Sequence, residues 1–333
     1  MLFKFSFPFV FLIIGYSVNS HYLFDFLIKN IWVYLAYFSI YIIVINILDI
    51  GLEIYINGIK TGFYTLNGLY VPVFSLIFVL FFFESIRSRR LKILTFIFSI
   101  LTLVITLSIL KRTLILILFF GLILFLFRNF NFKNFLRIGI IMIVSAFLFQ
   151  IYFYEYFGNT LESRENRFGS EYSISQEGRF TENQIVFQLM KESLAKLVFG
   201  FGETFNDMKY ISFTIYDERE IHNSYARIFW NGGFYGLILF LIFYWIQLKT
   251  MVSSYLIIRK NEKFIKQLFY FGFVLVIIRI INDLSSGITY LSYNALCYLI
   301  IGYLFRIGSI YFKYYRNRNR SKVFLNPNEK NTV

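Results

Sequence analysis

The sequence predicts an all-α protein, a polytopic bundle of about nine transmembrane helices that forms one integral membrane domain, 1–333. Of its 333 residues, 58% are hydrophobic, only 16% are charged and three are prolines. The mean hydropathy of +0.62 is typical of membrane proteins. Apolar runs recur along nearly the whole chain, so a single signal peptide does not account for them.

The expected helices follow from the length of these runs, because about 20 apolar residues cross a hydrocarbon core of about 30 Å. Nine runs approach that length, at 3–18, 31–50, 69–85, 91–109, 113–127, 136–154, 223–247, 267–281 and 289–306. The apolar part of the fifth run, Leu114 to Phe127, is short, because 14 residues at about 1.5 Å each span only about 21 Å. Either Lys111 and Arg112 snorkel from within this helix, or they lie inside the protein near the outer surface.

The positive charges predict the topology. The chain has 33 Lys and Arg against 19 Asp and Glu, and the basic residues occupy alternate connections. These clusters are Arg87, Arg89, Arg90 and Lys92; Arg128, Lys133 and Arg137; Lys249, Arg259, Lys260, Lys263 and Lys266; and the tail 307–333. The positive-inside rule assigns them all to the cytoplasm. Topology therefore explains the net charge of +14, and we expect no nucleic-acid partner.

One long connection, 153–221, then faces outward as an extracytoplasmic loop. It carries twelve acidic residues against seven basic ones. Within it, "GRFTENQIVFQLMKESLAKLVFGFGE" has the apolar spacing of an amphipathic helix that Gly200 and Gly202 stop. That helix either lies on the outer membrane surface or packs over the bundle. The last residues, 321–333, are expected to be disordered.

Ionisable groups in or beside the predicted spans are costly unless they are paired or solvated. They are Asp49, Glu84, Arg112, Arg227, Arg279 and Asp283. Arg279 and Asp283 are four residues apart, so a structural ion pair explains them. Asn223 and Arg227 have the same spacing and share one helix face. Interfacial solvation is sufficient for Asp49 and Glu84.

The candidate site collects residues that the topology places on the outer side. Arg112, His222 and Arg227 fall at the outer surface, and Arg179 lies in the outward loop. Arginine suits phosphate because its planar fork makes bidentate charge-assisted bonds, and histidine is a natural general base near neutral pH. Taken singly, each residue is explained as structural or solvated. Together they indicate chemistry on a phosphorylated substrate at the outer leaflet.

Metal and redox sites are not expected. Cys297 is the only cysteine, so neither an intramolecular disulfide nor a cysteine-based metal site is possible. The acidic cluster "DERE" (217–220) is better interpreted as a solvated loop than as a metal site, because no His or Asp lies at ligand spacing.

Three segments resemble, in order, the signatures of the O-antigen polymerase and ligase superfamily. "HNSYARIFWNGGFYGLILFL" is similar to its His-Asn pair before a helix with an early Gly. "LSILKRTLILILFFGLILFL" (107–126) looks like its Ser-Arg helix start, although Lys111 stands where a small residue is usual. "SQEGRFTENQIVFQLMKESLAKLVFGFGE" (175–203) looks like its loop segment, where an Arg begins a helix that ends in a Gly-x-Gly turn. The resemblance covers residues 65 to 250.

The resemblance implies a metal-independent and cofactor-free glycosyltransferase of the GT-C type in the bacterial cytoplasmic (inner) membrane, with its active site facing the periplasm or the outside. Its substrate would be an undecaprenyl-diphosphate-linked oligosaccharide in a setting of membrane lipids, and a chain-length regulator and a flippase of the same pathway are candidate partners. Arg112 and Arg179 would hold the diphosphate and His222 would act as general base. Asn223 would hold the imidazole or cap the helix, and Arg227 would support them.

Three functions remain open at this point. A polymerase joins lipid-linked repeat units and is favoured by the compact size and the short loop. A ligase moves the finished polymer to lipid A-core or another acceptor. A transporter or flippase is less favoured, because no paired broken helices or internal repeat is visible.

Overall fold

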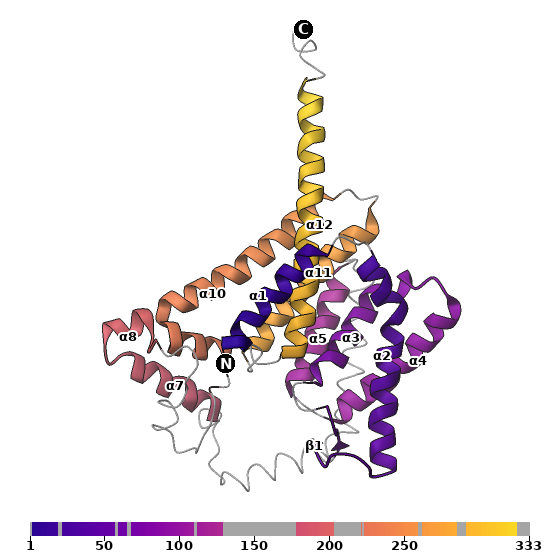
Figure 1. Ribbon diagram of the computed structural model, residues 1–333, viewed down its shortest axis with the longest axis horizontal. Helices are drawn as coiled ribbons and strands as arrows, with labels where there is room; N and C mark the ends of the chain where they lie inside the picture. The colour runs from indigo at the N-terminus through magenta and orange to yellow at the C-terminus, as the bar shows by residue number, and fades with distance from the viewer. Residues whose placement is uncertain are drawn as a thin grey trace. The chain divides into compact units, whose positions relative to one another are not determined.

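The computed structural model describes residues 2–18, 22–56, 59–64, 68–109, 112–128, 178–202, 221, 223–258, 262–284 and 291–324. Nearly all of this part of the chain is helical (Figure 1). In chain order the elements are α1 (Leu2–Ser17), α2 (Tyr22–Ile47), β1 (Tyr55–Ile56), β2 (Ile59–Lys60), α3 (Tyr70–Phe82), the 3₁₀ turn η1 (Phe83–Ser85), α4 (Arg89–Ser108), α5 (Arg112–Phe127), α7 (Gly178–Met190), α8 (Leu194–Phe199), α10 (Ser224–Ile257), α11 (Lys263–Asp283) and α12 (Leu291–Phe324).

Within the part of the chain that the structure describes, five helices are long and apolar enough to cross a membrane, which supports a multi-pass membrane protein. They are Leu23–Ile47, Arg89–Ser108, Ser224–Ile257, Lys263–Asp283 and Asn294–Tyr314. Two shorter apolar helices, Tyr70–Ser85 and Thr113–Phe127, fall on two further predicted spans, and α1 falls on the first. The predicted count of nine is not confirmed, since 136–154 lies outside the described residues.

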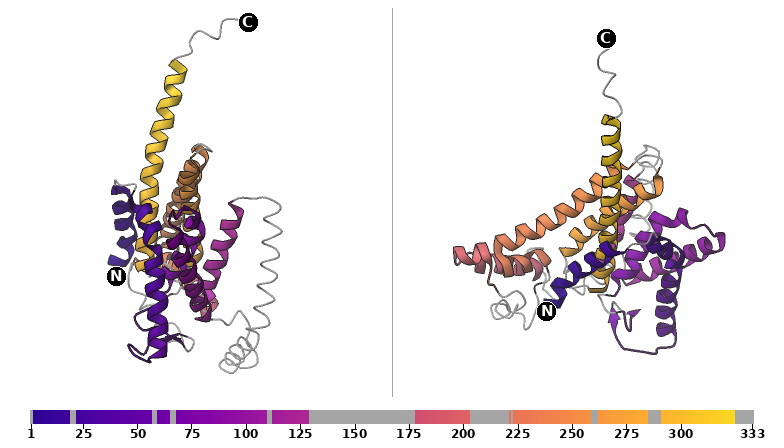
Figure 2. Two further views of the ribbon diagram at one scale, coloured as in Figure 1. Left: turned by 90° about the vertical axis from the view of Figure 1, so that its right-hand side faces the viewer. Right: turned by 45° about the horizontal axis from the view of Figure 1, so that its top comes forward.

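Three helices are longer than their apolar runs. α2 begins at Tyr22, well before the predicted start at 31, and carries Asp25 in its first turn, where the helix dipole favours an acidic side chain. α10 continues to Ile257 and α12 to Phe324. The prediction of disorder is therefore wrong for 321–324. No Gly or Pro follows Gly308 before the end of α12, so the helix continues past its apolar part (Figure 2).

The chain divides into two compact units. The first comprises Met1–Gly121 together with Leu237–Val333, and the second comprises Leu122–Gly236. The boundary falls inside α5 and α10, so each of these helices contributes residues to both units.

The core of the first unit forms around α3. This helix is only about 20 Å long at about 1.5 Å per residue, and nearly all of its side chains are buried. Phe78 contacts Phe271 of α11 edge to face, at 5.6 Å between ring centroids. Phe24 of α2 stacks against Phe78 at 6.1 Å. α3 is therefore a protein-enclosed helix, which explains why its sequence is apolar all round.

The α1 and α12 helices pack through glycines (Figure 1). A Cβ at Gly15 of α1 would lie 2.0 Å from the carbonyl oxygen of Leu299. A Cβ at Gly302 of α12 would lie 2.0 Å from the carbonyl oxygen of Leu12. Small residues allow this close approach of two backbones, the usual basis of helix association in lipid.

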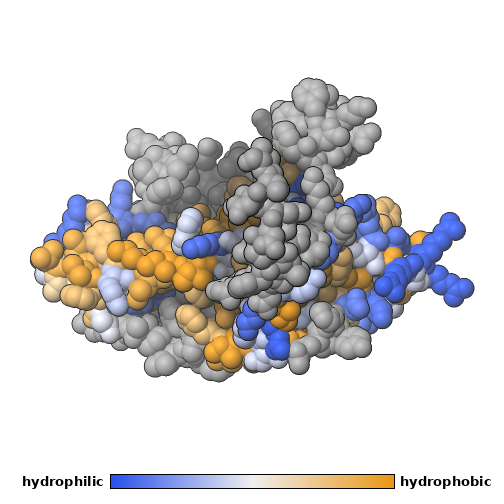
Figure 3. Space-filling view, turned by 90° about the horizontal axis from the view of Figure 1, so that it is seen from above, coloured by the Kyte–Doolittle hydropathy of each residue, from blue (hydrophilic) through white to orange (hydrophobic). Residues whose placement is uncertain are grey.

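Apolar side chains also cover the outside of the helices. Large hydrophobic residues are exposed on α1, α2, α4 and α10, among them Ile13, Phe26, Tyr37, Phe96 and Trp245. Apolar surface is visible over much of the face in Figure 3. Such a surface is expected where lipid is the solvent.

A short hairpin connects α2 to α3. Strands β1 and β2 are antiparallel, with Tyr55 opposite Lys60. The buried Lys60 donates to Asp49 at 2.9 Å, and this bond lowers the pKa of Asp49 and raises that of Lys60. The Asn46 side chain exchanges two hydrogen bonds with the Lys60 backbone, at 2.7 and 3.0 Å. These contacts attach the hairpin to the end of α2.

Candidate functional site

Two of the predicted site residues are at the first described positions of helices. Arg112 is the first residue of α5 and belongs to the first unit. Arg179 is the second residue of α7 and belongs to the second unit. His222 precedes α10 and lies outside the described residues, as does the acidic cluster 217–220. Asn223 and Arg227 belong, like Arg179, to the second unit.

The first turn of a helix favours negative charge. Backbone N–H groups and the helix dipole create a partial positive charge there, which disfavours a cation by about 0.3–1 kcal/mol and favours an anion. Phosphate groups are bound at such positions in many proteins. The placement of Arg112 and Arg179 therefore fits two sites that receive negative charge.

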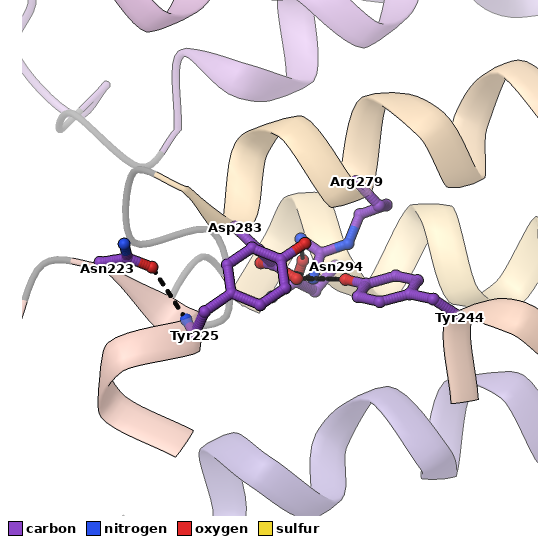
Figure 4. Close-up of polar contacts among 6 residues, drawn as sticks. All are labelled: Asn223, Tyr225, Tyr244, Arg279, Asp283 and Asn294. Carbon is purple, nitrogen blue, oxygen red and sulfur yellow. Dashed lines mark hydrogen bonds and ion pairs between the residues drawn. The ribbon is translucent and has the colours of Figure 1, made fainter. Parts of the chain in front are cut away.

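The start of α10 is fixed by Asn223. Its side-chain oxygen accepts a hydrogen bond from the Tyr225 N–H at 3.0 Å (Figure 4). This is the bond of an N-cap residue, and it confirms the capping that the sequence predicted. Because the amide oxygen is committed to the helix, Asn223 fixes the backbone directly after His222.

Arg227 follows one turn later on the same face, as its spacing predicted. Its N–H donates to the Asn223 carbonyl at 2.9 Å, so the helix is regular here. The Arg227 side chain is buried within the second unit. From this position Arg227 is suited to supporting the start of α10 from inside the protein.

The α10 helix breaks at Gly233, which adopts φ 59° and ψ −156°. Carbonyls in the last turn before a break lack donors in their own helix. Here the Trp230 carbonyl accepts from the Phe201 N–H at 2.9 Å, and the Asn231 carbonyl accepts from the Gly202 N–H at 3.3 Å. The turn after α8 thus satisfies the carbonyls that precede the break.

Only glycine fits on either side of this contact. Gly200 has φ 74°, and a Cβ there would lie 2.4 Å from the Asn231 carbonyl carbon. A Cβ at Gly233 would lie 2.4 Å from the Val198 carbonyl carbon. Two motifs that are far apart in the sequence, the Gly-x-Gly turn and the segment after His222, therefore meet backbone to backbone.

Aromatic side chains complete the contact. Phe201 stacks on the buried Trp230 with 3.9 Å between centroids. Phe187 of α7 stacks on Phe229 at 6.3 Å. These contacts hold α7, which carries Arg179, against the first segment of α10, which follows His222. No sequence pattern predicted these contacts, although the Gly232–Gly233 pair is a signal for a helix break.

The loop segment 178–203 was expected to form one helix and forms two. α7 ends at Met190, and Ser193 caps α8 by accepting from the Lys196 N–H at 3.2 Å. A serine favours a cap over a helix interior. Gly200 ends α8 as predicted, and short helices are confirmed within this segment.

The Arg279–Asp283 ion pair is confirmed, and it belongs to a hydrogen-bonded cluster that the sequence did not predict. The two side chains lie 3.1 Å apart and are fully buried in the first unit. Tyr244 donates to Asp283, and Arg279 donates to Asn294 (Figure 4). A buried ion pair needs such additional hydrogen bonds to offset its desolvation. The spacing of two residues on one helix contained no signal for Tyr244 or Asn294, which come from α10 and α12.

A model of the O-antigen ligase family matches residues 94–241. This range contains Arg112, Arg179, His222, Asn223 and Arg227. Comparisons with curated proteins and with solved structures gave no match.

The glycine contact predicts a graded response to alanine. We expect Gly200→Ala and Gly233→Ala to lower the thermal unfolding temperature and to abolish activity, because each adds a backbone clash to a φ that costs about 1–3 kcal/mol for other residues. Gly232→Ala is the matched control, since its Cβ would meet no atom within 4 Å. Gly202→Ala, with φ 68° and the same open space, measures the backbone strain alone. Equal unfolding temperatures for all four variants would contradict the contact.

Proposed function

We propose that this multi-pass membrane protein is a surface-polysaccharide polymerase, because a model of the O-antigen ligase family matches residues 94–241 and the three motifs named above fall in or beside that range. It joins undecaprenyl-diphosphate-linked oligosaccharide repeat units by glycosyl transfer, as a metal-independent enzyme of the GT-C type. The reaction takes place on the outer face of the bacterial cytoplasmic membrane, with the loop 153–221 outside and the tail 307–333 in the cytoplasm.

The observation that supports this proposal is the position of the charged site residues within the matched segment. Arg112 is the first described residue of α5 and Arg179 the second of α7, and both fall in the matched range with His222. A diphosphate carries the compact negative charge that arginine binds with bidentate, charge-assisted bonds.

In the proposed reaction the lipid-linked saccharide is the donor and its diphosphate is the leaving group. An acceptor hydroxyl oxygen attacks the anomeric carbon, and the bond from that carbon to the diphosphate oxygen breaks. His222 takes the hydroxyl proton as general base. Arg112 and Arg179 offset the charge that develops on the departing diphosphate, which stays attached to the lipid.

Asn223 and Arg227 act on the geometry and not on the substrate in this proposal. Asn223 fixes the residue after His222 by capping α10 at 3.0 Å. Arg227, buried one turn further on, keeps that turn attached to the second unit. Pathway partners such as a flippase and a chain-length regulator would deliver the donor and set the polymer length.

His222→Ala should abolish glycan extension, because it removes the base that takes the proton from the acceptor hydroxyl. The protein level should be unchanged. The measurement is turnover of the organism's own undecaprenyl-diphosphate repeat unit by the purified variant. His21→Ala is the matched control, since His21 is the only other histidine. Normal chains made by His222→Ala would show that the assignment is wrong.

Arg179→Lys should reduce turnover strongly, because a lysine is a point charge that does not replace a bidentate fork. Arg90→Lys provides the comparison, since Arg90 also lies in the first turn of a helix, α4, on the side that the charge pattern assigns to the cytoplasm. If the Arg179→Lys enzyme turns over as fast as the Arg90→Lys enzyme, Arg179 is structural.

A ligase is the second candidate, favoured by the description of the matching family model itself. Deletion of the gene separates the two functions. A missing polymerase leaves glycolipid capped by a single repeat unit, whereas a missing ligase leaves it uncapped and lets lipid-linked polymer accumulate. We expect the first result, read by gel analysis of the surface glycolipid.

A further inference from the structure

The α8 helix of the second unit is apolar and largely exposed. Four of its six residues are hydrophobic in "LAKLVF", counting its two leucines, valine and phenylalanine, and none of the six is buried. Leu194 is 76% exposed and Phe199 is 65% exposed, and Phe187 near the end of α7 is 45% exposed. Val186 and Met190 of α7 are fully buried, so the face of α7 that packs against the protein is not the face that carries Phe187.

We propose that α8 and the adjoining end of α7 form an interfacial anchor, with Phe187, Leu194 and Phe199 inserted into the headgroup region of a lipid bilayer. Transfer of a Leu or Phe side chain from water to an apolar layer is favourable. Three such side chains in one short segment therefore favour a lipid surface over water. Amphipathic segments of this kind lie in the plane of the interface.

The α8 helix contacts α10 at its break. The Gly233 backbone touches that of Val198 in α8, so α8 lies beside the first segment of α10. That segment is the start of the candidate membrane span Ser224–Ile257, which is consistent with a position of α8 near a lipid surface.

The exposed patch extends onto α10 within the second unit. The Phe199 ring lies 6.5 Å from that of Tyr235, which is itself exposed, as is Phe234 next to it. Both residues belong to the candidate membrane span Ser224–Ile257, so lipid is the solvent expected at this patch.

Two lysines border the patch in the manner of interfacial lysines. Lys191 Nζ lies 4.4 Å from the Phe187 ring centroid, and Lys196 Nζ lies 4.8 Å from that of Phe201. Glu192 pairs with Lys196 at 2.6 Å. Lysines that lie over aromatic rings keep their charge at the headgroups while the rings enter the apolar layer. Anionic phospholipid is therefore the occupant that fits the patch.

The test measures depth in a bilayer. Cysteines introduced at Leu194, Phe199 and Glu192 are spin-labelled one at a time in the full chain, reconstituted in nanodiscs of phosphatidylethanolamine and phosphatidylglycerol. The only native cysteine, Cys297, is buried, so the wild-type chain is the labelling blank. We expect the ratio of oxygen to nickel-chelate accessibility to be higher at positions 194 and 199 than at position 192.

Two results would overturn the proposal. One is the same ratio at all three positions, which would place α8 in water. The other is low accessibility to both reagents at 194 and 199, which would indicate a protein partner or a second copy of the chain. Leu194→Glu and Phe199→Glu check the result without labels, since they should shift α8 out of the lipid and raise its proteolytic cleavage in nanodiscs. The readouts do not involve turnover, so they are independent of the proposed function.

Discussion

The second unit depends on a contact between two stretches of main chain. Where α10 breaks at Gly233, the turn from Gly200 to Gly202 donates its N–H groups to the Trp230 and Asn231 carbonyls. The bonds use no side chain, and the distances exclude any Cβ at Gly200 or Gly233. This contact holds the end of α8 at the break of α10, and the stacking of Phe187 on Phe229 attaches α7 to the same segment. Every other relation between Arg179 and the residue after His222 follows from it.

The positions of two arginines in the fold distinguish a structural role from the proposed role in substrate binding. Arg279 lies in the middle of a closed set of partners, with a carboxylate at 3.1 Å and a tyrosine ring at 5.4 Å. Its charge is neutralised within the protein, and the first unit gains a link between α10, α11 and α12. Arg179 stands instead at a helix start, where the backbone favours an anion. Composition alone does not distinguish the two residues.

Periodicity and charge were sufficient to predict most helices, the Asn223 cap and the Arg279–Asp283 pair, because these depend on neighbours within about four residues. The helix ends were predicted less well, because α10 and α12 continue beyond their apolar runs. Hydropathy indicates which residues lie in lipid and does not indicate where a helix ends. The break at Gly233 and the Tyr244–Asp283 bond were missed. The adjacent Gly232 and Gly233 are a local signal for the break, but its partner in the turn after α8 and the Tyr244–Asp283 bond depend on residues distant in sequence. The order of the motifs, by contrast, predicted the family that the match over 94–241 supports.

The pairing of α1 with α12 bears on the order in which the protein assembles. Apolar surface gains nothing by leaving lipid for another helix, so the two helices associate only through close packing of their backbones. Gly15 is made early in synthesis, but the Leu299 carbonyl and Gly302 that it packs against are made only after α2 to α11. Until then α1 lacks the glycine contact that joins it to α12. Closure of the first unit is therefore a late, post-insertion step.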